Sequence, residues 1–73
     1  MGTANLLISI TSGNWESGLT WDAGRSPQIG DIVIIDQNHI VTINGNANAQ
    51  SVEYRGTGSL RFNSATSKLN IGF

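Results

Sequence analysis

The stretch that decides the fold begins with Asp31-Ile32-Val33-Ile34-Ile35-Asp36 and runs to Phe73, and in it apolar residues recur every 19 positions. The positions related by this spacing are Val33, Val52 and Ile71; Ile35, Tyr54 and Phe73; Val41 and Leu60; and Ile43 and Phe62. Asn44 is followed at the same interval by Asn63. Because each apolar residue meets another one repeat later, the pattern predicts short strands stacked in parallel, two per turn, with the two asparagines stacked at a corner.

The predicted strands cover residues 32–35, 40–43, 51–55 and 59–63, with corners at 44–49 and 64–67 and a third turn beginning at 68–73. Alternation along each strand predicts which side chains face the core. Those that point inward, or lie at its margin, are Val33, Ile35, Val41, Ile43, Val52, Tyr54, Leu60, Phe62, Leu69, Ile71 and Phe73, and those that point outward are Ser51, Glu53, Ser59, Arg61 and Asn70. Ile32, Ile34 and Ile40 fall on the outer face, so we expect another segment or another chain to cover them.

The residues before this stretch predict a cap, so the single domain 1–73 divides into a cap at 1–29 and turns at 30–73. Residues 5–10 are apolar and β-branched and lack a counterpart at the 19-residue spacing, which indicates a capping or added edge strand. The loop-rich segment 11–29 contains Trp15 and Trp21. Their rings either form a stacking platform for a sugar or a base, or cover the open end of the strands. The second interpretation is favoured, because a small domain needs that apolar area for its core.

Composition limits the classes of function. The 73 residues include no cysteine and one histidine, His39, so disulfides are excluded and a zinc site is not expected. The net charge is −1 and the four basic residues are scattered, which disfavours nucleic acid as a partner. No apolar run is long enough to cross a bilayer, and the N-terminus lacks the basic region of a secretory signal. We therefore expect no membrane partner and no export by that route from this chain, unless a leader has been removed.

The acidic residues do not form a catalytic pattern. No two of the five carboxylates stack at the repeat spacing, whereas glycosidases need a close pair. Asp36 and His39 are near each other in sequence and form a possible acid–base couple, but a turn histidine in a structural role is favoured. We expect no catalytic residue, no cofactor and no metal.

Part of the chain resembles a known group of proteins. The motifs are Ser12-Gly13-Asn14-Trp15, Thr20-Trp21-Asp22, Gly24, Pro27, Gly30-Asp31-Ile32-Val33-Ile34 and His39-Ile40-Val41-Thr42-Ile43. They resemble the opening of bacterial surface and phage parallel β-helix proteins, and the extracellular domain named for its eight glycines. The resemblance implies a tryptophan-rich cap leading into a right-handed parallel β-helix, although members of these families continue for many more turns. It implies a scaffold, not one activity.

The predicted function is structural. Two turns of parallel strand leave an open edge, and exposed edges invite pairing, so we expect a second copy or a larger shell or fibre to cover it. The predicted interface residues are Ile32, Ile34, Ile40, Leu60, Phe62 and Phe73. The favoured setting is the virion, as a capsid-decorating or fibre component of a phage. The alternative is the cap or carbohydrate-binding module of a secreted bacterial surface adhesin that holds glycan on Trp15 and Trp21, and an enzyme fragment is the least favoured reading.

Overall fold

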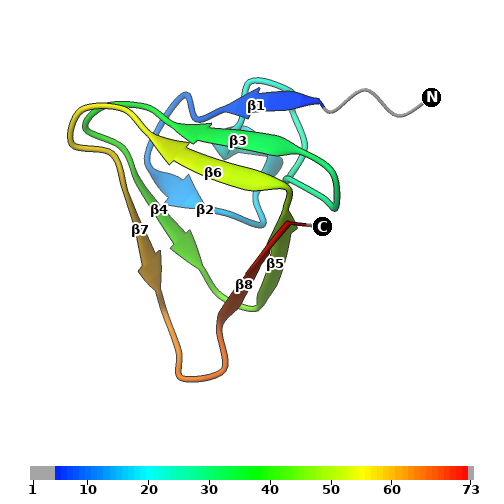
Figure 1. Cartoon of the computed structure of the whole chain (residues 1–73). Coiled ribbons are helices and arrows are strands. Elements are labelled where there is room, and N and C mark those ends of the chain that lie inside the picture. The colour runs from blue at the N-terminus through cyan, green and yellow to red at the C-terminus, as the bar shows by residue number, and fades with distance from the viewer. Residues whose placement is uncertain (1–4, 73) are drawn as a thin grey trace.

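The computed structural model describes residues 5–72 and shows an all-β solenoid of about three turns. Its elements are β1 (Leu6–Ile8), β2 (Gly13–Asn14), the 3₁₀ helix η1 (Gly18–Thr20), β3 (Ile32–Ile35), β4 (Ile40–Ile43), β5 (Asn46–Ala49), β6 (Ser51–Tyr54), β7 (Ser59–Phe62) and β8 (Lys68–Ile71). They form three parallel sheets with the strand orders β1-β3-β6, β2-β4-β7 and β5-β8. Figure 1 shows these sheets as the three sides of a triangle.

The predicted 19-residue register is confirmed on two of the three sides. Val33 pairs with Val52 in the β3–β6 ladder, and Val41 pairs with Leu60 in the β4–β7 ladder. β-branched and aliphatic residues dominate β3, where three of the four residues are buried, and β4, where alternate residues are buried. The repeat therefore identifies real neighbours in space.

The third side corrects the prediction of two strands per turn. The segment expected to be a corner contains β5, and the segment expected to begin a third turn is β8, which pairs with β5. Asn46 lies beside Lys68, a spacing of 22 residues, because the loop before β8 is longer than the two-residue corner before β5. Ile71 consequently pairs with Ala49 and does not continue the column of Val33 and Val52.

The core lies inside the triangle and is closed at the N-terminal end by the cap. Its buried residues are Leu7, Trp15, Trp21, Val33, Ile35, Val41, Ile43, Ala47 and Ala49, and Val52, Leu60 and Leu69 pack against them. The two indole rings meet edge to face with centroids 5.3 Å apart, and Trp21 Nε1 donates to the backbone oxygen of Trp15 at 3.0 Å. The prediction that the tryptophans cover this end is confirmed.

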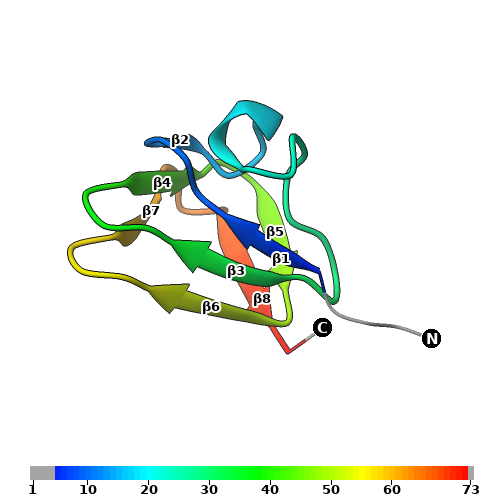
Figure 2. The same ribbon diagram turned by 90° about the horizontal axis from the view of Figure 1, so that it is seen from above.

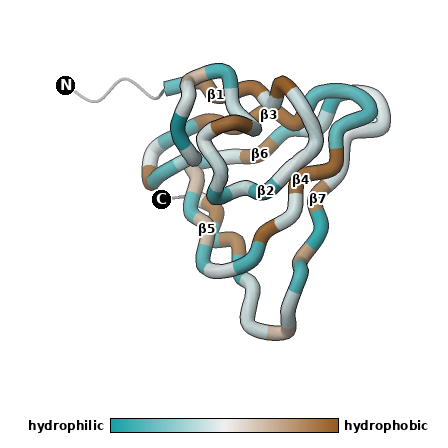
Figure 3. Tube along the Cα trace, turned by 180° about the vertical axis from the view of Figure 1, so that it is seen from behind, coloured by the Kyte–Doolittle hydropathy of each residue, from teal (hydrophilic) through white to brown (hydrophobic). Residues whose placement is uncertain are grey.

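The predicted edge strand is β1, which pairs in parallel with β3. Its own outer edge is covered by residues 20–22. Ile10 N–H donates to Thr20 O at 2.8 Å, and Asp22 N–H donates to Ile8 O at 3.0 Å. Figure 2 shows the cap segment around η1 lying over one end of the stack. Figure 3, seen from the side opposite to that of Figure 1, shows this end facing the viewer. Residues 20–22 therefore cover this edge at Ile8 and Ile10.

Candidate assembly interface

The opposite end of the solenoid is an open rim formed by β6, β7 and β8. Each is the last strand of its sheet within residues 5–72. Ile35, Ile43 and Ala49 are fully buried one turn earlier. Their register partners Tyr54, Phe62 and Ile71 are 52%, 53% and 49% exposed. Inward residues are thus about half exposed to solvent in the last turn, because no further turn of the described residues packs against them.

The rim also presents backbone hydrogen-bonding groups. Arg55 N–H donates to Ile35 O at 2.9 Å, Asn63 N–H to Ile43 O at 2.9 Å, and Lys68 N–H to Gly45 O at 2.9 Å. Backbone groups alternate in direction along a strand, so the residues between these bonds point their N–H and C=O groups the other way. The residues that face away from the preceding turn are Val52, Tyr54, Leu60, Phe62, Leu69 and Ile71. The rim is therefore a template for three further strands.

The charges are divided unevenly between the two ends. Residues 51–72 contain Arg55, Arg61 and Lys68 against Glu53, which gives +3 − 1 = +2. The other charged residues, with His39 counted as neutral, are one arginine and four carboxylates at positions 16–36, which give +1 − 4 = −3. The sum is the net charge of −1. The turn that carries the open rim, residues 51–72, is therefore net positive, and residues 16–36 are net negative.

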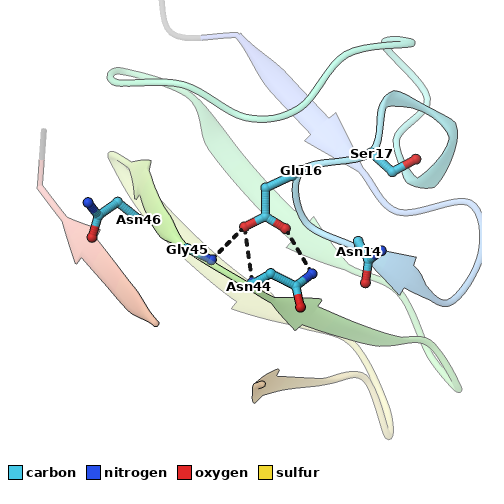
Figure 4. Close-up of a pocket in the computed structure, with 6 residues that line it drawn as sticks. All are labelled: Asn14, Glu16, Ser17, Asn44, Gly45 and Asn46. Carbon is cyan, nitrogen blue, oxygen red and sulfur yellow. Dashed lines mark hydrogen bonds between the residues drawn. The ribbon is translucent and has the colours of Figure 1, made fainter. Parts of the chain in front are cut away.

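The closed end is capped by side chains that take the place of a preceding turn. Ser9 Oγ accepts from Asp36 N–H, and Ser12 Oγ accepts from Ile40 N–H, both at 2.9 Å. Glu16 Oε2 accepts from the N–H groups of Asn44 and Gly45, both at 3.1 Å (Figure 4). These bonds satisfy first-turn N–H groups at the corners, where no earlier strand reaches.

The hydrogen bonds to Glu16 lower the pKa of its carboxyl group. Partial burial alone raises the pKa of this carboxyl, but hydrogen bonds from its own N–H, from the N–H groups of Asn44 and Gly45, and from the Asn44 side chain outweigh that effect and lower the pKa. The carboxylate form is therefore favoured at the corner between β4 and β5. Glu16 also lines a shallow cleft with Asn14, Ser17, Asn44, Gly45 and Asn46 (Figure 4).

The corner below Glu16 continues as an asparagine ladder. Asn63 Nδ2 donates to Asn44 Oδ1 at 2.7 Å, which confirms the predicted stacking of these two residues. A second pair lies on the third side, where Asn70 Nδ2 donates to Asn48 Oδ1 at 3.1 Å. Each ladder links one turn to the next through side chains, in addition to the backbone bonds.

A second carboxylate ties the cap loop to the first full turn. Buried Asp31 accepts from both terminal nitrogens of the Arg25 guanidinium, at 2.8 and 3.3 Å, and from Gln28 N–H at 2.8 Å. The hydrogen bond from Arg25 is the largest cause of the lowered pKa of Asp31 and outweighs the effect of its burial. The bidentate geometry is the strong form of this pair, and its role is to hold the loop.

The histidine that the sequence singled out is held by a buried serine. Ser9 Oγ lies 2.7 Å from His39 Nδ1, and the Asp36 carboxylate accepts from Gln37 N–H at 2.8 Å. Because Ser9 is buried and its oxygen also accepts from Asp36 N–H, this pair caps a corner and presents no nucleophile to solvent. No motif in the sequence points to Ser9, because its partner His39 is 30 residues away.

The predicted interface residues are distributed over different environments. Phe62 and half-buried Leu60 lie on the rim, Ile40 is exposed and Ile32 is half-buried. Ile34 is only 6% exposed, so its prediction as an interface residue is wrong: the chain itself covers this side chain. Phe73 lies outside the described residues.

The predicted stacking platform is also contradicted by burial. Trp15 and Trp21 are both fully buried and pack against each other, so neither ring offers a free face to a sugar or a base. Trp15 borders a second cleft with residues 26–29, and its buried Nε1–H has no hydrogen-bond partner among the described residues.

Residues 5–72 contain no group of three or more His, Asp or Glu placed to hold a metal ion. In the same part of the chain, no helix has the length and apolar character needed to span a membrane. No family model matches the chain, and no curated protein or solved structure is significantly similar to it.

Proposed function

We propose that the chain is a non-enzymatic structural subunit that assembles with another polypeptide through its open rim. The observation that carries the proposal is the contrast between the two ends. At the N-terminal end, residues 20–22 bond to β1, two buried tryptophans cover the core and side chains cap the corners, whereas within residues 5–72 no strand lies beyond β6, β7 and β8, which carry half-exposed apolar residues. Such an edge pairs readily with another strand.

A second copy is the simplest partner, and the net positive charge of the turn that carries the rim provides a way to identify it. Two copies meeting rim to rim bring +2 against +2, so added salt strengthens their association by screening the repulsion. An acidic partner of a larger shell or fibre is bound more weakly as salt is added. The setting that we propose is a phage virion, and this part of the proposal rests on the sequence resemblance. The adhesin alternative loses its glycan platform because both tryptophans are buried.

Sedimentation velocity at low micromolar concentration tests self-association. The wild type should sediment as an oligomer, and Phe62→Asp, which places a charge on the rim, should sediment as a folded monomer. Leu19→Asp is the matched control, because Leu19 lies in the cap and is already exposed. A well-folded wild-type monomer at all salt concentrations would refute assembly with a second copy, and equal effects of the two substitutions would refute the rim as the interface.

A further inference from the structure

The corner between β4 and β5 contains the dipeptide Asn44-Gly45, which is chemically reactive. The backbone nitrogen of the glycine can attack the side-chain carbonyl carbon of the asparagine. A C–N bond forms, ammonia leaves with the proton of the attacking nitrogen, and the product is a cyclic succinimide. Water then opens the ring to aspartate or isoaspartate. A following glycine favours the reaction because no side chain crowds its nitrogen, and at Gly45 nothing lies within 4 Å of the position of a Cβ atom.

In the folded chain, both reacting groups are engaged in hydrogen bonds. Asn44 Nδ2 donates to Glu16 Oε1 at 3.3 Å, and Asn44 Oδ1 accepts from Asn63 Nδ2 at 2.7 Å. Gly45 N–H donates to Glu16 Oε2 at 3.1 Å. Figure 4 shows both groups bonded to the carboxylate of Glu16. The attack therefore requires the Asn44 carboxamide and the Gly45 N–H to give up these hydrogen bonds.

We infer that Asn44 is a deamidation site that the fold protects, with Glu16 as the clamp. The inference is independent of the proposed function. The effect of deamidation on the fold follows from the contacts between Asn44 and Glu16. Deamidation replaces the Nδ2 donor by a second carboxylate beside Glu16, and an isoaspartate also lengthens the backbone by one methylene between β4 and β5. Both changes weaken the attachment of the cap to the first full turn.

The test compares deamidation at Asn44 in folded and urea-unfolded wild type, in mildly alkaline buffer. The tryptic peptide 26–55 is followed by mass spectrometry, with fragmentation to place the change among its asparagines. Glu16→Ala should raise the folded-state rate roughly tenfold, because the reactive turn then breaks fewer hydrogen bonds, each of modest net strength. Glu16→Gln should give a smaller increase, because the amide oxygen still accepts one bond.

Two controls separate the clamp from general effects. Glu53→Gln makes the same chemical change on an exposed strand far from the corner, and should leave the rate unchanged. Ile35→Val destabilises the core without touching the corner, so it reports how much reaction passes through the unfolded state. The inference is overturned if folded and unfolded wild type deamidate equally fast at Asn44. It is also overturned if the Glu16 variants react no faster than Ile35→Val, or more slowly than wild type, because Glu16 would then be inert or act as a base.

Discussion

The removal of one methylene from an inward isoleucine in the first full turn and from one at the rim measures how much cover the rim lacks. Ile35 and Ile71 are both inward residues, but Ile35 is fully buried and Ile71 is 49% exposed. A buried methylene contributes about 0.8 kcal/mol, and Ile→Val in a packed core costs about 0.5–1.5 kcal/mol. We expect Ile35→Val to cost about 1 kcal/mol. At the half-exposed Ile71, the same change should cost about 0.4 kcal/mol, because about half of the transfer term is lost and no closed cavity forms.

Urea unfolding followed by tryptophan fluorescence and circular dichroism measures both values. For a chain of this length, the total free energy of unfolding is about 4–11 kcal/mol, so the difference is measurable. At low protein concentration, Ile35→Val should be the more destabilising variant. As the concentration rises and rims meet, the cost of Ile71→Val should approach that of Ile35→Val. Equal costs at every concentration would contradict the arrangement in which β8 borders solvent.

Three further outcomes are expected. Trp21→Phe removes the donor to Trp15 O and part of the cap, and should lower the free energy of unfolding by about 1–3 kcal/mol in urea titration. The pKa values of Glu16 and Asp31 are lowered by folding, so the unfolded chain binds protons first as the pH falls. The contribution of these groups to stability is therefore complete above the carboxyl pKa of the unfolded chain and is lost as the pH falls through the pKa values of the folded chain. Glu16→Gln should reduce the slope of stability against pH in the acid range, and stability should still be independent of pH near neutrality. Gly58→Ala places a Cβ 2.5 Å from a backbone oxygen of the preceding turn and should destabilise by about 1–3 kcal/mol, whereas Gly45→Ala meets open space and should be nearly neutral by thermal unfolding.

The sequence predicted those parts of the fold in which bulky apolar residues recur. Val33, Val52, Val41 and Leu60 identified two sides of the triangle, because stacked turns need matching apolar residues at one spacing. The third side was missed because β5 reads Asn-Ala-Asn-Ala, which combines small inward residues with a type that is common in turns. Its longer spacing also differs from the repeat on the other two sides.

The features of the cap and the rim that bear on function could also be predicted only in part from the sequence. The sequence alone predicts that the tryptophans cover the core, because their rings carry a large apolar surface. The capping by Ser9, Ser12 and Glu16 could not, because each side chain meets a corner 27 to 29 residues away without a repeated motif. The excess of positive charge at the rim was present in the sequence, but only the topology assigns those residues to one end.

The closed cap also has a consequence for the order of events during synthesis. The strands of the cap pair with β3 and β4, so a nascent chain can complete its closed end before residues 51–72 emerge. Each later strand then finds a finished neighbour 19 or 22 residues behind it, and closing loops of this size is entropically cheap. Folding can therefore proceed in the direction of translation, with the aggregation-prone edge exposed only at the advancing front.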